Sequence, residues 1–150
     1  MRRGLWCVIT SLALAALMLP ALAMANSAEV YRDPSCGCCG GWIHYLQAHG
    51  YTVTSHEDQS MAAVKARLGV PTDAASCHTA LIGGYVIEGH VPVEDIRRLL
   101  AEQPDARGLA APGMPMGSPG MEMGTPVRYH VLLIARDGSS RVFATHGPQA

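Results

Sequence analysis

The chain has 150 residues, a length that favours a single domain. Eleven Lys and Arg residues balance twelve Asp and Glu residues to a net charge of −1, and no basic block is present, so we expect no nucleic-acid partner. Seven His, eight Met and five Cys are many for so short a chain, and these residues carry soft and borderline ligands for transition metals.

Residues 1–25 have the pattern of a secretory signal peptide. Met1-Arg2-Arg3 is a short basic start, residues 12–19 form an apolar run, and Ala23-Met24-Ala25 offers a cleavage site. The apolar run is too short to be read as a membrane-spanning helix. We therefore expect one mature domain over residues 26–150, acting in the periplasm with no membrane contact after cleavage.

The hydrophobic pattern of the mature chain predicts a mixed α/β domain. We expect strands over 28–32, 51–56, 79–82 and 85–88, and helices over 42–48, 60–68 and about 92–102. Gly83-Gly84 supplies the two-residue turn between the third and fourth strands. The resulting order, β-α-β-α-β-β-α, is that of thioredoxins and glutaredoxins, with a parallel pair of strands first and an antiparallel pair second.

The C-terminal third begins with a segment of unusual composition. Residues 108–126 are dominated by Gly, Pro and Met, a density that argues against helix and strand and predicts a long loop. Two more strands over 129–135 and 141–145, with Asp137-Gly138 at their turn, predict an added C-terminal β-hairpin.

Three cysteines lie where a turn leads from the first strand into the first helix. Cys36 and Cys39 have the C-x-x-C spacing of thiol oxidoreductases, and a helix N-terminus stabilises thiolates there. Cys38, a third thiol between them, would form competing disulfides in an exchange enzyme and instead favours soft-metal binding. Spacings of one and zero residues differ from those of structural zinc sites. They suit sulfur atoms that each bridge two Cu(I) ions, so we expect a multinuclear cluster.

Cys77 and His78 precede the third strand, on the side that faces the N-terminus of the first helix in this fold. Thioredoxins place a cis-proline there, which this sequence lacks. Counting back from Gly83-Gly84 places His90 opposite Cys77. We therefore expect Cys77 to join the other thiols, with His78 and His90 near it. His90 would be a ligand, a proton donor or a polar residue at the strand end.

Four methionines of the predicted loop form two M-x-M pairs: Met114, Met116, Met121 and Met123. A methionine in a loop has no core to fill, whereas a thioether is a soft ligand that selects Cu(I). The thioether has no proton to lose and cannot be closed into a disulfide. We therefore expect these residues to contribute to copper binding.

Three segments in order resemble the CopG-like family of periplasmic proteins associated with copper resistance. They are SCGCCGGW at 35–42, SCHTALIGGYVIEGHVP at 76–92 and GLAAPGMPMGSPGME at 108–122. The resemblance covers most of the mature chain. It implies a thioredoxin-like fold and copper bound by the four cysteines Cys36, Cys38, Cys39 and Cys77, with His78 and the methionines near.

The leading hypothesis is a periplasmic Cu(I)-binding protein for copper resistance or homeostasis. It would hold copper in the thiolate cluster and pass it to copper export or chaperone proteins, with the methionine loop as a lid or transfer arm. One alternative is a thiol or copper oxidoreductase with Cys36 as nucleophile and Cys39 as its resolving partner.

Other interpretations of the same residues remain open. The even number of cysteines would also fit two structural disulfides, for example Cys36–Cys39 with Cys38–Cys77, and a zinc site is a third possibility. We expect three histidines to be ordinary surface or helix residues: His44, His49 and His56. The sequence does not place two others, His130 and His146.

Overall fold

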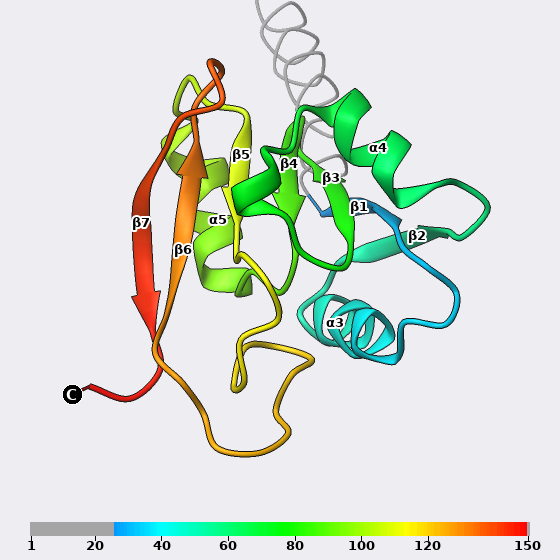
Figure 1. Cartoon of the computed structure of the whole chain (residues 1–150), viewed down its shortest axis with the longest axis vertical. Coiled ribbons are helices and arrows are strands. Elements are labelled where there is room, and N and C mark those ends of the chain that lie inside the picture. Colours follow the sequence, from blue (N-terminus) through cyan, green and yellow to red (C-terminus); the bar gives the residue numbers. More distant parts are fainter. Residues whose placement is uncertain (1–25, 150) are drawn as a thin grey trace, which may run out of the picture.

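A computed structural model describes residues 26–149 as one mixed β-sheet with three α-helices around it (Figure 1). The strands are β1 (Ser27–Tyr31), β2 (Thr52–His56), β3 (Thr79–Ile82), β4 (Tyr85–Glu88), β5 (Gly108–Ala110), β6 (Tyr129–Ile134) and β7 (Ser140–His146). The helices are α3 (Gly37–Ala48), α4 (Met61–Leu68) and α5 (Val93–Glu102), with a 3-10 turn at Thr72–Ala74. The predicted α/β class and element order are confirmed. The predicted signal peptide lies outside the described residues.

The sheet has the order β2-β1-β3-β4-β5-β6-β7. As predicted, β1 and β2 are parallel, and β3 and β4 form an antiparallel hairpin. Gly83 and Gly84 have φ values of 56° and 84°, the left-handed conformation that a tight two-residue hairpin turn demands. Thr79 pairs with Glu88 in the resulting register, so residues just beyond this pair meet at the open end of the hairpin.

The ends of the helices show how local sequence sets their limits. Ser60 caps α4 by accepting a hydrogen bond from the Ala63 amide at 3.5 Å, and Gly69 ends it in the left-handed conformation. Helix α3 begins at Gly37 rather than at Trp42, so the predicted start was too late. Gly40 and Gly41 have low helix propensity, but packing of the rest of the helix overrides that preference.

The prediction of loop for the whole segment 108–126 is wrong at its start. Gly108–Ala110 forms β5, which is parallel to β4 and antiparallel to β6. A Cβ on Gly108 would lie 1.7 Å from the Val86 carbonyl oxygen, so only glycine fits this close strand pairing. The C-terminal hairpin of β6 and β7 is therefore a continuation of the main sheet (Figure 1).

The main core lies on the face of the sheet that α3 and α5 cover. Side chains from both helices join alternate residues of the strands in one cluster, which includes Trp42, Leu46, Ile96, Leu99, Val30, Ala80, Ile82 and Ile87. Because side chains alternate across a strand, Thr79 and Glu88 lie on the opposite face, where Lys65 of α4 reaches both. Within residues 26–149, none of the helices is long and apolar enough to cross a bilayer.

Candidate metal centre

The first turn of α3 presents three cysteines at the end of β1. Cys36 is the residue before the helix, and Cys38 and Cys39 lie in its first turn. Two hydrogen bonds from the preceding residues fix the start of the helix. The Cys36 amide donates to the Asp33 carbonyl at 3.0 Å, and Arg32 Nη1 donates to the Cys36 carbonyl at 3.0 Å. The partial positive charge of a helix N-terminus therefore acts on these sulfur atoms and favours their thiolate form when they are reduced.

All four cysteines among the described residues, 26–149, meet at this point. Their Sγ atoms lie within 4.8 Å of one another. Cys36 and Cys39 form a disulfide, and Cys38 and Cys77 are free thiols. The Cys38 Sγ lies 3.4 Å from Cys36 Sγ and 3.9 Å from Cys77 Sγ. Of the two disulfides that the even cysteine count allowed, the structure thus contains Cys36–Cys39 and leaves the Cys38–Cys77 pair open.

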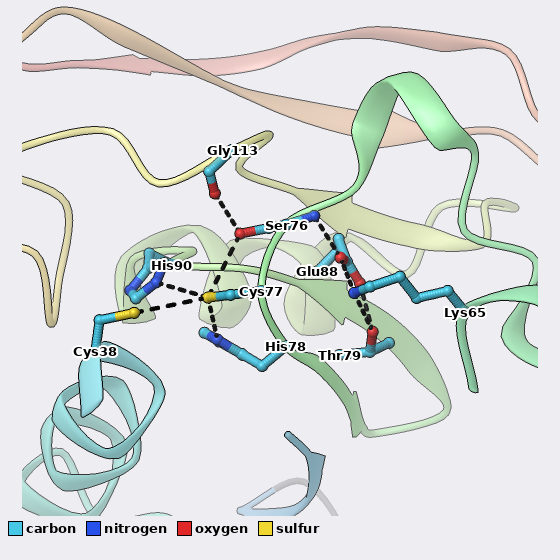
Figure 2. Close-up of polar contacts among 9 residues, drawn as sticks. All are labelled: Cys38, Lys65, Ser76, Cys77, His78, Thr79, Glu88, His90 and Gly113. Atoms are coloured by element: carbon cyan, nitrogen blue, oxygen red, sulfur yellow. Dashed lines mark hydrogen bonds and ion pairs between the residues drawn. The ribbon is translucent and has the colours of Figure 1, made fainter. Parts of the chain in front are cut away.

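Two buried imidazoles contact the Cys77 sulfur (Figure 2). The Cys77 Sγ lies 3.3 Å from His78 Nδ1 and 3.2 Å from His90 Nε2. The hairpin register places His90 at this end, as the count from the Gly83-Gly84 turn predicted. These three residues form a second group of candidate ligands that shares Cys77 with the first.

The surroundings hold both imidazoles in the neutral form that binds metals. His90 Nδ1 lies 2.8 Å from the Pro119 carbonyl, an acceptor, so Nδ1 carries the proton and the lone pair of Nε2 points toward Cys77. Burial lowers the pKa of His90 and lowers that of His78 well below its ordinary value. His78 lies against Trp42, with ring centroids 4.5 Å apart, and its Nε2 has no hydrogen-bond partner among the described residues.

The Cys77 side chain is a protonated thiol at neutral pH. Burial, and next the proximity of Cys38, raises its pKa to about 11. A metal ion that binds this sulfur must therefore displace a proton, which makes binding depend on pH. Figure 2 shows the Cys77 sulfur in contact with Cys38 and with both histidines.

The loop methionines differ in their distance from this centre. The Met114 Sδ lies 3.9 Å from the Cys38 Sγ, and Met114 is 52% exposed. Met116 and Met123 are exposed, whereas Met121 is buried. Of the four methionines predicted as ligands, the structure therefore brings Met114 to the sulfur atoms, while it buries the side chain of Met121.

The methionine loop is fixed against the centre at two places. The Gly113 amide donates to the Ala75 carbonyl at 3.1 Å, next to the segment that carries Cys77. Gly120, with φ of 83°, lies so close to α3 that a Cβ there would be 2.6 Å from the Trp42 amide nitrogen. Pro119 and Gly120 were not anticipated as site residues, although a Pro-Gly pair in a loop is a turn signal.

The five remaining histidines have other partners or lie apart. His49 contacts the Tyr45 carbonyl, and His130 contacts Thr145. Hydrogen bonds to carboxyl groups hold two more, with 2.6 Å between the closest atoms in both His56–Glu29 and His146–Asp95. Within residues 26–149, the two groups of clustered candidate ligands include none of these histidines and not His44.

Comparisons with known proteins place the chain among copper resistance proteins. A family model described as "Protein of unknown function, DUF411" matches residues 74–121. No curated protein sequence matches the chain. Two solved structures named "Copper resistance protein copG", Form 1 and Form 2, are each 48% identical to it.

The likeness to both structures extends over nearly their whole length. Form 1 has a TM-score of 0.77 and matches 83% of this chain and 99% of its own, and Form 2 has a TM-score of 0.76 with 81% and 98%. The homologues and the cysteine cluster together support a role related to copper. By this identity and coverage, the chain belongs to the CopG family of copper resistance proteins.

Proposed function

We propose that this protein binds Cu(I) in the periplasm and holds it in a cluster of cysteine thiolates. The observation that carries the proposal is the meeting of four Sγ atoms within 4.8 Å of one another, three from the start of α3 and one from Cys77, which is distant in sequence. Thiolates are soft ligands that select Cu(I) among the common metals, although tetrahedral sulfur sites also suit zinc. The copper resistance homologues favour copper over zinc here.

The donor set extends beyond the sulfur atoms of cysteine. His78 and His90 present neutral nitrogen atoms 3.3 and 3.2 Å from the Cys77 Sγ, and Met114 brings a thioether to Cys38. Cys38 and Cys39 are adjacent in the chain, so their two sulfur atoms cannot easily both coordinate the same ion. Thiolates that each bridge two ions suit such neighbours, so the cluster holds more than one Cu(I).

The Cys36–Cys39 disulfide sets a condition for this binding. With the disulfide closed, the available thiols among residues 26–149 are those of Cys38 and Cys77. Reduction by a thiol reductant breaks the S–S bond with two electrons and two protons, and frees Cys36 and Cys39 for copper. Full occupancy therefore belongs to the reduced protein.

The exposed methionines give copper a route to and from the cluster. Met116 and Met123 are exposed on the loop, and Met114 is half-exposed while it touches Cys38. A thioether cannot enter a disulfide, so these residues keep their affinity in an oxidising compartment. The loop thus acts as a transfer arm between the cluster and copper export or chaperone proteins in the periplasm. The chain reaches the periplasm by means of residues 1–25, a signal peptide that is then cleaved.

The test is an anaerobic Cu(I) titration of the reduced protein, residues 26–150, with free thiols counted in parallel. We expect more than one Cu(I) per chain and thiols that become protected as copper binds. Replacing all four cysteines with serine should abolish tight binding, whereas His130→Ala, a histidine outside the centre, should leave it unchanged. Full binding by the four-serine variant would refute the proposal. A preference for Zn²⁺ over Cu(I) in competition would replace it with a zinc site.

A second function, thiol or copper oxidoreductase, is favoured by one observation: Cys36 and Cys39 are joined in a disulfide at a helix N-terminus. In that role the Cys36 thiolate attacks a substrate disulfide, and Cys39 then displaces the reduced substrate to re-form the bond. An insulin-reduction assay decides this point. Activity no greater than that of a Cys36→Ser variant would remove the oxidoreductase hypothesis and leave copper binding untouched.

A further inference from the structure

Glu88 is a buried carboxylate at the end of a strand that is otherwise apolar. It has no exposed surface, and it lies on the α4 face of the sheet, opposite the main core. An ionised carboxylate away from water is costly unless it is paired and hydrogen-bonded. Even a well-paired buried ion pair is often no more stable than an apolar pair of similar volume. The presence of Glu88 therefore calls for a role other than stability.

Three donors converge on the two oxygen atoms of Glu88 (Figure 2). Lys65 and the backbone amide of Ser76 donate to Oε1, the amide at 2.6 Å, and Thr79 Oγ1 donates to Oε2 at 2.6 Å. The Lys65 Nζ also donates to Thr79 Oγ1 at 3.0 Å. The carboxylate is thus fully held, and one of its partners is a backbone group outside any strand or helix.

That backbone partner immediately precedes Cys77. The Ser76 amide is anchored on Glu88, and on the other side of Cys77 the His78 carbonyl accepts a hydrogen bond from the Gly89 amide at 3.0 Å. A Cβ on Gly89 would lie 2.5 Å from the Ser76 Cβ, so the glycine lets the segment approach β4 this closely. Cys77 therefore lies between two anchors, both at the end of β4.

The segment before Cys77 is also hydrogen-bonded to the methionine loop. Ser76 Oγ donates to the Gly113 carbonyl, and the Gly113 amide returns a bond to the Ala75 carbonyl at 3.1 Å. Met114, the next residue, reaches Cys38. A shift of the Ser76 backbone would thus move both Cys77 and Met114 relative to the first turn of α3.

We propose that Glu88, held by Lys65, is a positioning residue of the metal centre: by fixing the Ser76 amide it sets the place of the Cys77 sulfur opposite Cys38. The effect on copper affinity rests on the proposed function, whereas the effect on the geometry of the two thiols does not. The two effects can therefore be measured separately.

The geometric test uses the metal-free protein of residues 26–150 with the Cys36–Cys39 disulfide closed, in which Cys38 and Cys77 are the free thiols. Dibromobimane joins two thiols that lie close together, and it becomes fluorescent when it does so. We expect Glu88→Gln to slow this cross-link about tenfold, the lower end of what loss of an outer-shell partner costs a metal site. Asp95→Asn is the matched control, because Asp95 is also a buried carboxylate paired with a base, His146, but contacts no residue of the centre.

The copper test uses the same variants after reduction. Glu88→Gln should weaken Cu(I) binding by about 10- to 100-fold in competition with a chromophoric chelator, while Asp95→Asn should match the wild type. Lys65→Met with Glu88→Leu removes both charges, so it leaves no unpaired ion beside β4, as Glu88→Gln does at Lys65. This double variant should still lose the cross-link, which separates positioning from the loss of an ion pair and replaces Glu88→Gln if that variant does not fold.

The proposal is overturned if a folded Glu88 variant cross-links at the wild-type rate, or if Asp95→Asn loses as much cross-linking as Glu88→Gln. A wild-type protein that binds no copper would refute the proposed function instead. In that case the cross-linking rates would still decide whether Glu88 positions Cys77.

Discussion

Gly120 is the place where the methionine loop is most sensitive to a single added methyl group. The residue has φ of 83°, and a Cβ on it would lie 2.6 Å from the Trp42 nitrogen, 3.0 Å from the Cys38 oxygen and 3.1 Å from the Gly41 carbonyl carbon. All three are backbone atoms of α3, so none can move aside as a flexible side chain would. We expect Gly120→Ala to lift the loop from α3 and to pull the Pro119 carbonyl away from His90.

The size of the effect follows from three contributions. An alanine in the left-handed conformation costs about 1 kcal/mol. Loss of the Pro119–His90 hydrogen bond adds about 1 kcal/mol, and lost packing brings the total to about 2–3 kcal/mol. Gly124 is the natural control, because it has φ of 78° but a Cβ there would meet no atom of a more distant described residue within 4 Å. Gly124→Ala should therefore cost only the conformational contribution of about 1 kcal/mol.

Urea unfolding of the metal-free protein measures both free energies of unfolding. The reasoning requires Gly120→Ala to be more destabilising than Gly124→Ala by at least about 1 kcal/mol, a difference that linear extrapolation resolves. It also requires weaker Cu(I) binding in Gly120→Ala, because His90 loses the bond that fixes its tautomer. Equal free energies for the two variants would show that the loop is not docked on α3 through Gly120.

The remaining predictions concern the centre itself. The rate of Cys77 alkylation in the metal-free protein, followed by peptide mass mapping, should rise about tenfold per pH unit, because the thiolate is the nucleophile. The rise should continue to the pKa of about 11. A plateau near pH 9 would contradict the assigned burial of Cys77. Since the folded state keeps this proton after the unfolded state has lost it, the same shift lowers stability as pH rises from 9.0 to about 11. Met114→Leu should weaken Cu(I) binding in a competition titration, while Met123→Leu should not. Equal effects of the two substitutions would show that the position of Met114 beside Cys38 does not matter for binding. Copper binding should quench the fluorescence of Trp42, which lies against His78, and an unchanged emission at full occupancy would place the metal elsewhere.

Local signals were sufficient to predict most of the regular elements. Ser60 and Gly69 mark the ends of α4, and Gly83-Gly84 fixes the hairpin register, so the sequence already places His90 near Cys77. These signals work because capping and tight turns depend on a few neighbouring residues. The order of the elements alone was enough to predict that Cys77 lies near the cysteines of α3.

Features that depend on tertiary contacts could not be predicted in the same way. The three residues of β5 carry no strand pattern of their own, and their conformation comes from pairing with β4 and β6 on both sides. The early start of α3 at Gly37 contradicts the low propensity of its glycines, one of which lies against Gly120. The burial of Met121 and of Glu88 likewise depends on segments distant in sequence.

The placement of β5 also bears on how freely the methionine segment can change during evolution. Its ends are fixed by β5 and β6, neighbouring strands of one sheet, so the chain between them begins and finishes at nearly the same place whatever its length. The entropy cost of closing such a segment grows only slowly as residues are added. Natural variation can therefore add or remove thioether donors between Ala110 and Tyr129 without disturbing the scaffold, provided that the glycines at 113 and 120 are kept.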